Sequence, residues 1–95
     1  MEQDLYSGAN FENAELSDVE VGAVEANFDY CEVKSIVMKQ LEGDLSLKKQ
    51  TVYLRNTIVE GDIIFEQGNG HVIVEGSSKV KGKIIGGTKE KIKEQ

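Results

Sequence analysis

Ninety-five residues, 39% of them hydrophobic and 29% charged, are enough for one folded domain and too few for two. A single cysteine, Cys31, excludes an intramolecular disulfide, and no apolar run reaches the roughly 18 residues of a membrane helix. The net charge of −6 is uneven, since residues 1–33 hold nine carboxylates and no base, whereas residues 34–95 hold eight carboxylates and eleven bases. The negative electrostatic potential expected around the N-terminal third disfavours nucleic acid as a partner and favours a basic protein.

The first residues are acidic and lack the apolar core of a signal peptide. We expect residues 1–8 to form an N-terminal lead or cap. With Met1 as the native start, we also expect a cytoplasmic protein without membrane contact.

A five-residue step runs from residue 9 to residue 26, pairing a small or branched residue with a second apolar one. The pairs are Ala9 with Phe11, Ala14 with Leu16, Val19 with Val21, and Val24 with Ala26. The segments ANFEN and AELSD resemble the pentapeptide-repeat β-helices, in which such a step lines a narrow square coil. The step predicts that coiling starts at about residue 8, although the pattern places no turns within residues 28–40.

One phrase occurs three times further on, as L-E-G-D-L at 41–45, V-E-G-D-I at 59–63 and V-K-G-K-I at 80–84. Its glycines are 18 and 21 residues apart, and alternating segments follow the first two copies at 51–55 and 71–75. Repeats of this length, built from short period-2 segments, are typical of β-solenoids. We therefore predict an all-β fold, a single-stranded parallel β-helix over residues 8–87 with coils of about 18–21 residues. An antiparallel meander also has short strands, but it gives no reason for a phrase to recur in register.

Stacked coils align equivalent residues into inward ladders of apolar side chains. The predicted ladders are Leu41–Val59–Val80, Leu45–Ile63–Ile84, Leu47–Phe65, Val52–Val72 and Leu54–Val74. We expect Gly43, Gly61 and Gly82 at the coil corners, where a positive φ or a close backbone approach requires glycine.

On the outside, stacking would align Glu42 with Glu60 and Lys81, and Asp44 with Asp62 and Lys83. Four carboxylates on adjacent coils could hold a hard cation such as Ca²⁺. No calcium-loop spacing accompanies them, so we interpret them as an exposed charge ladder and predict no metal.

No signature of catalysis is found, and we predict no enzyme, no cofactor and no small-molecule substrate. His71 is the only histidine and is expected at the surface, since one histidine cannot form a zinc site alone. We expect Cys31 to be a small buried hydrophobe, and Phe11 and Phe65 to lie in the core. The last segment, 88–95, is charged and is expected to be a frayed tail or a single helical turn.

The candidate partner face comprises six carboxylates of the N-terminal third, together with an outward tyrosine and its neighbouring arginine, and a solubilising surface is the competing interpretation. The residues of this face are Glu12, Glu15, Asp18, Glu20, Glu25, Asp29, Tyr53 and Arg55. A module of this kind would dock a basic protein, as an immunity protein for a basic toxin does, or would mimic DNA as some pentapeptide-repeat proteins do.

The coils V-E-G-D-I-I-F and S-K-V-K-G-K-I-I-G-G resemble those of the bactofilins, bacterial polymer-forming cytoskeletal proteins with repeats of the V-x-G-x-I type. The resemblance covers residues 41–87 and implies a triangular right-handed β-helix that polymerises end to end without nucleotide. The chain has fewer coils than the family core, and it lacks the basic or apolar N-terminal segment that some members use at membranes.

The open ends of a solenoid present unpaired strand edges that invite stacking on another chain. We therefore expect a non-enzymatic structural module that self-associates as a homo-oligomer or polymer. The acidic binding module is the alternative.

Overall fold

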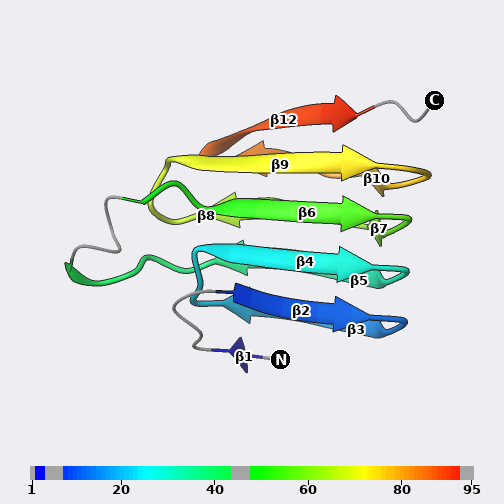
Figure 1. The fold of residues 1–95 in the computed structure, drawn as a ribbon, viewed down its shortest axis with the longest axis horizontal. Helices are drawn as coiled ribbons and strands as arrows, with labels where there is room; N and C mark the ends of the chain where they lie inside the picture. The colour runs from blue at the N-terminus through cyan, green and yellow to red at the C-terminus, as the bar shows by residue number, and fades with distance from the viewer. Residues whose placement is uncertain (1, 4–7, 44–47, 93–95) are drawn as a thin grey trace.

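The structure, a computed structural model, describes residues 2–3, 8–43 and 48–92. These residues form a parallel β-solenoid of about four turns with coils of about 20 residues, which confirms the predicted fold class. Figure 1 shows the front strands running to the right and the rear strands returning to the left while the chain climbs from the N to the C terminus. The coil is therefore right-handed.

Each coil contributes to two parallel sheets that face each other. Sheet A, at the rear of Figure 1, contains β1 (Glu2–Gln3), β3 (Glu15–Val21), β5 (Glu32–Met38), β7 (Ile58–Val59), β8 (Ile63–Phe65), β10 (Lys79–Val80) and β11 (Ile84–Ile85). Sheet B, at the front, contains β2 (Gly8–Glu12), β4 (Glu25–Asp29), β6 (Thr51–Arg55), β9 (Gly70–Glu75) and β12 (Gly87–Ile92).

The rear face changes direction within each coil. In the first two coils β3 and β5 are continuous strands, but two successive outward residues, 17–18 in β3 and 34–35 in β5, interrupt their alternation between inward and outward side chains. In the third and fourth coils Gly61 and Gly82 divide the rear face into two short strands, β7 with β8 and β10 with β11. Only this second half has three strands per coil.

The strand register shows how many residues each coil contains. Gly8 is aligned with Glu25, Glu25 with Thr51, Thr51 with His71 and Gly70 with Gly87, so the successive coils hold 17, 26, 20 and 17 residues. The second coil is long because the chain leaves it between β5 and β6, at the left in Figure 1. β2 begins at Gly8, near the predicted start of the coil, but β1 (Glu2–Gln3) already pairs in register with β3.

Inward side chains of both sheets form the core, where equivalent residues of successive coils lie over one another. Phe11 and Phe28 stack with ring centroids 4.7 Å apart and an interplanar angle of 9°. The aligned inward series are Ala9–Ala26–Val52–Val72, Phe11–Phe28–Leu54–Val74, Leu16–Val33–Val59–Val80, Val19–Ile36–Ile63–Ile84 and Val21–Met38–Phe65. These series contain the predicted pairs Val52–Val72, Leu54–Val74, Val59–Val80 and Ile63–Ile84.

The predicted ladder position of Leu41 was wrong. Val33 is aligned with Val59, Ile36 with Ile63 and Met38 with Phe65, so β5 supplies the rung that L-E-G-D-L was expected to form. The phrase lies in the excursion between β5 and β6, where Leu41 is buried outside the main core and Leu45 and Leu47 are not among the described residues. The two segments differ in spacing, because β5 passes from Val33 to Ile36 in three residues, whereas the third coil passes from Val59 to Ile63 in four, around Gly61. A search for the five-letter phrase therefore could not find β5 as the aligned segment.

Two of the three predicted corner glycines lie on the coil. A Cβ on Gly61 would lie 2.8 Å from the carbonyl oxygen of Lys34, and a Cβ on Gly82 would collide with the carbonyl oxygen of Gly61. Both glycines are therefore required by close backbone approach between coils. Gly43 differs, since it lies in the excursion with a φ of +63° and open space around its Cβ position.

Gly82→Ala is expected to lower the free energy of unfolding by about 3 kcal/mol, because the added methyl group forces two stacked backbones apart. Gly43→Ala is expected to cost only about 1 kcal/mol, the strain of a left-handed alanine. Urea denaturation followed by circular dichroism measures both. Equal losses would show that the corner of the fourth coil yields more easily than its close contacts indicate.

The charged C-terminal segment forms a strand, where a frayed tail or a helical turn was expected for residues 88–95. All six residues of β12 are in register with β9, from Gly87 beside Gly70 to Ile92 beside Glu75. The unpaired backbone groups of β9 offer this segment hydrogen bonds that an isolated short helix would lack. At the other end, β1 pairs with β3. Residues 93–95 lie outside the described chain.

Candidate functional site: corners and ends of the solenoid

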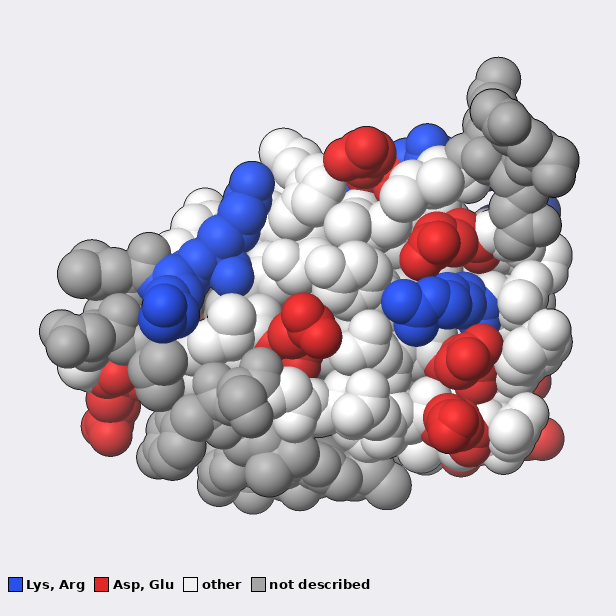
Figure 2. All heavy atoms as spheres, in the orientation of Figure 1, with Lys and Arg blue, Asp and Glu red and all other residues white. Residues whose placement is uncertain are grey.

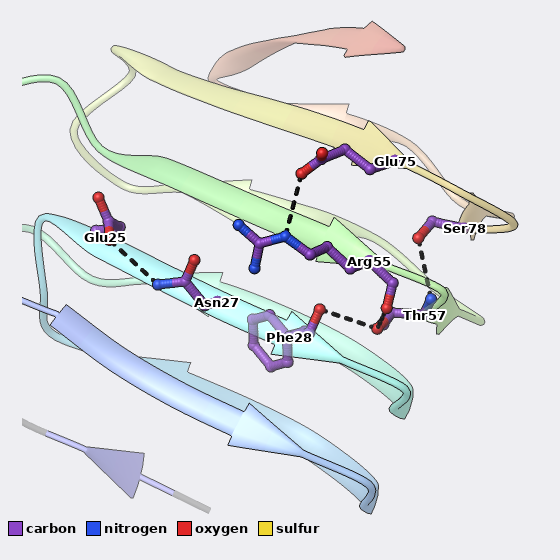
Figure 3. A network of polar contacts seen from close by, with 7 residues as sticks. All are labelled: Glu25, Asn27, Phe28, Arg55, Thr57, Glu75 and Ser78. Atoms are coloured by element: carbon purple, nitrogen blue, oxygen red, sulfur yellow. Dashed lines mark hydrogen bonds and ion pairs between the residues drawn. The ribbon is translucent and has the colours of Figure 1, made fainter. Parts of the chain in front are cut away.

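A buried polar corner joins sheet B to sheet A at the right of the solenoid (Figure 3). The hydroxyl of Thr57 accepts a hydrogen bond from the backbone N–H of Cys31 at 3.2 Å and lies 3.1 Å from the carbonyl oxygen of Phe28. The N–H of Thr57 donates to the hydroxyl of Ser78 at 3.0 Å. Thr57 is fully buried and Ser78 nearly so. These small side chains satisfy backbone groups where the chain turns, so the corner is structural.

The residues considered for chemistry do not converge on a catalytic centre. Cys31 is buried in the core, as expected, with its Sγ 3.4 Å from the carbonyl oxygen of Asp29. His71 lies on the outer side of sheet B, with Nδ1 3.0 Å from Thr88 Oγ1 and Nε2 3.0 Å from Glu90 Oε1. It therefore links β9 to β12.

Within residues 2–3, 8–43 and 48–92, no group of three His, Cys, Asp or Glu side chains is placed to hold a metal ion. The same described residues include no helix long and apolar enough to cross a membrane.

The outward charges of the repeated phrase form part of the predicted ladder. Lys81 Nζ lies 3.2 Å from Glu60 Oε1, and the backbone N–H of Lys83 donates to Asp62 Oδ1 at 2.8 Å. The expected alignment of Glu42 with Glu60 was wrong, because Lys34 lies at the level of Glu60. Asp44 lies outside the described residues. Glu42 and Glu60, two of the carboxylates considered for a cation, are therefore not stacked.

The predicted partner face is divided between opposite sides of the molecule. Its members on sheet B are Glu12, Glu25, Asp29, Tyr53 and Arg55, and its members on sheet A are Glu15, Asp18 and Glu20. Figure 2 shows acidic and basic side chains gathered in a column at the right-hand end of the sheet B face. The predicted residues therefore lie on both sheets of the first three coils and do not form one face.

Tyr53 points outward beside Arg55, as predicted, but the arginine is already engaged. Its guanidinium carbon lies 5.6 Å from the centroid of the Tyr53 ring. Its Nε lies 3.3 Å from Glu75 Oε2 (Figure 3). A partner would have to displace these contacts to reach the guanidinium group.

A corner series of left-handed residues was not predicted from the sequence. Asn13, Tyr30 and Asn56 have φ values of 49°, 54° and 48°, and Gly76 follows in the fourth coil with 65°. Each of the three non-glycine residues donates its N–H to a carbonyl of the next coil, those of Asp29, Arg55 and Glu75 in turn. Tyr30 is the exceptional member, with 63% of its surface exposed. An open groove of about 670 Å³ adjoins it.

The two ends of the solenoid are half coils. At the N-terminal end sheet A extends one strand further than sheet B, because β1 lies on β3 while β2 is the last strand of its sheet. At the C-terminal end sheet B extends one strand further, because β12 lies on β9 while β10 and β11 end sheet A.

The inward register of β12 is occupied by lysine. Lys89 is aligned with Val72 and Lys91 with Val74, both of which are core residues. Inward charges on an edge strand are one way in which proteins limit the addition of further strands. The terminal strand is thus partly protected against the addition of a further strand. The charges of residues 88–95 would have indicated this once the segment was recognised as a strand.

Comparison with protein-family models, with curated proteins and with solved structures found no match for this chain. The solenoid fold therefore rests on the strand register itself, and the resemblance to the bactofilins is carried by the repeated phrases alone.

Proposed function

We propose that this protein is a non-enzymatic structural module that self-associates head to tail along the solenoid axis. The match between its two half coils carries the proposal. When a second copy stacks on the C-terminal end, β12 of the first copy and β1 of the second complete one coil, with one strand in each sheet. The solenoid would then continue without a break.

The burial of the core supports the same contact. Val59 and Ile63 are fully buried, but Val80 and Ile84, which continue their ladders in the fourth coil, are only partly buried. At the other end, Ala14 and Leu16 are the partly buried members. Stacking would lower the exposure of apolar side chains at both ends, and burial of apolar surface favours association.

Charge selects the orientation of this contact. The first coil carries four carboxylates and no base, namely Glu12, Glu15, Asp18 and Glu20. Residues 71–92 carry five lysines against two glutamates, a net charge of +3 with His71 neutral. Unlike ends attract and like ends repel, so a head-to-tail contact is favoured over either two-fold contact. Head-to-tail contacts that do not close generate open filaments.

The inward lysines of β12 limit the strength of the contact. In a continuous stack Lys89 would lie over Ala9 and Lys91 over Phe11 of the next copy. Their aliphatic stems can cover apolar surface while the ammonium groups reach solvent, at a cost in packing. We therefore propose a weak, reversible association.

Sedimentation velocity at increasing protein concentration, at low and at high salt, tests the proposal. The average mass is expected to rise with concentration and to fall in high salt, since the Debye length shrinks from about 10 Å at 0.1 M to about 3 Å at 1 M. A strictly monomeric species at the highest concentration would contradict the proposal.

A charge-reversed pair locates the interface. Lys79→Glu with Lys83→Glu at the basic end is expected to weaken association. Lys48→Glu with Lys49→Glu, between β5 and β6 and outside both terminal strands, is the matched control and is expected to leave it unchanged.

An acidic binding module is the second candidate function. It is favoured by pairs of carboxylates on adjacent strands, Glu12 beside Asp29 and Glu15 beside Glu32. Such a module would bind a basic protein with an affinity that falls with salt.

A further inference from the structure

Tyr30 combines high exposure with an unfavourable backbone conformation. Its φ of 54° lies in the left-handed region, whereas the equivalent corners use Asn13, Asn56 and Gly76, residue types that adopt this region readily. The N–H of Tyr30 donates to the carbonyl of Arg55 at 2.9 Å, a backbone contact that any residue but proline could make. The ring therefore contributes nothing that the turn requires, while 63% of the residue faces solvent.

Two pairs of like charges lie on either side of this corner. Glu12 is aligned with Asp29 at the end of sheet B, and Glu15 with Glu32 at the start of sheet A. Directly opposed like charges on neighbouring strands are destabilising. Within the described part of the chain none of the four carboxylates has an ion-pair partner, and Arg55, next in register after Asp29, is paired with Glu75.

Three unfavourable features thus occur together at one corner of the first two coils. A strained tyrosine and two repelling pairs each lower stability, and the other corners avoid the strain with asparagine or glycine. Departures from local preference that gather at one place are expected where a protein keeps residues for binding at the expense of stability.

The shape of the corner fits an extended ligand. The open groove is lined by the corner residues Asn13, Tyr30 and Asn56 and by Glu15, Glu32 and Ile58, which are aligned with one another at the start of sheet A. An exposed aromatic ring next to carboxylates suits a guanidinium group. This group can stack on the ring and donate hydrogen bonds to both carboxylates. Lysine lacks the planar face and the paired donors.

We propose that this corner docks an extended, arginine-bearing segment of another protein, with Tyr30 as the anchor. One arginine stacks on the ring and pairs with Glu15 or Glu32, and a second base is held by Glu12 and Asp29 across the corner. The site lies on the side of the solenoid, so it does not depend on head-to-tail stacking.

Tyr30→Asn is the decisive variant, because asparagine occupies the equivalent positions in the first and third coils. Titration with a synthetic peptide of alternating arginine and glycine, followed by NMR chemical shifts, measures binding. We expect saturable shifts centred on residues 30, 15 and 32, at least tenfold weaker binding by Tyr30→Asn, and weaker binding of the lysine version of the peptide. The melting temperature of Tyr30→Asn is expected to rise by about 4 °C, since the strain is relieved.

Tyr53→Thr is the matched control, because it removes the outward tyrosine already covered by Arg55 and is expected to leave peptide affinity unchanged. Equal affinity of Tyr30→Asn and the native protein would overturn the proposal, as would a lower melting temperature, which would make the ring structural. Loss of self-association in Tyr30→Asn would also overturn it, by placing a second copy of the chain on the corner.

Discussion

Replacement of Phe28 by alanine is expected to lower the free energy of unfolding by about 3–5 kcal/mol. The side chain is fully buried and lies between Phe11 and Leu54 in the inward ladder of sheet B. Its ring stacks on that of Phe11 with centroids 4.7 Å apart, a contact that adds to the loss of buried surface. Because both neighbouring coils are held in register by backbone hydrogen bonds, they cannot collapse into the cavity.

Guanidinium denaturation measures the loss, which is a large part of the roughly 5–15 kcal/mol that stabilises a typical domain. Phe11→Ala is the matched control, since Phe11 heads the same ladder and is 7% exposed. It is expected to cost less than Phe28→Ala, because only one side of its ring is packed within the core series. A larger loss at Phe11 would show that the N-terminal coil is the more tightly packed part of the solenoid.

The third and fourth coils could be predicted from the sequence because one phrase encodes two requirements at once. In V-E-G-D-I and V-K-G-K-I the branched ends face the core, and the glycine lies where two backbones come too close for a Cβ. Both requirements repeat with each coil, so copies 21 residues apart align correctly.

The first two coils were harder to predict because their repeat has a different length. G-A-N-F-E at 8–12 and E-A-N-F-D at 25–29 are 17 residues apart and are aligned along their whole length in sheet B. This 17-residue repeat gives the length of the first coil, whereas the five-residue step does not. L-E-G-D-L resembles the later phrases more closely, and the sequence offers no means of knowing that β5 supplies the rung aligned with V-E-G-D-I.

Surface grouping could not be predicted, since it depends on which of two opposed sheets a strand joins. Glu12 and Glu15 are three residues apart in the chain, yet one belongs to sheet B and the other to sheet A. Tyr30 could not be singled out from the sequence, because its left-handed φ of 54° depends on the geometry of the corner. Asn13 and Asn56, each directly after a strand of sheet B, were the available clue.

The C-terminal end provides the sharpest test of how the solenoid is limited. Lys89→Val with Lys91→Leu is expected to strengthen head-to-tail association at least tenfold, which corresponds to about 1.4 kcal/mol. The substitutions continue the apolar ladders of Val72 and Val74 into the terminal strand and remove the charges that oppose strand addition. Sedimentation velocity at fixed ionic strength measures the change, and larger assemblies should appear at concentrations where the native chain is monomeric.

Lys79→Val with Lys83→Leu is the charge-matched control, because it removes two lysines from the same end at exposed positions. It lowers the attraction between unlike ends by a similar amount without extending the core, so it is expected to weaken association. If both double variants assemble alike, net charge and not the inward register governs the contact. If the inward variant stays monomeric while gaining stability, β12 is a cap, and the axial edges of this solenoid are closed to a second copy.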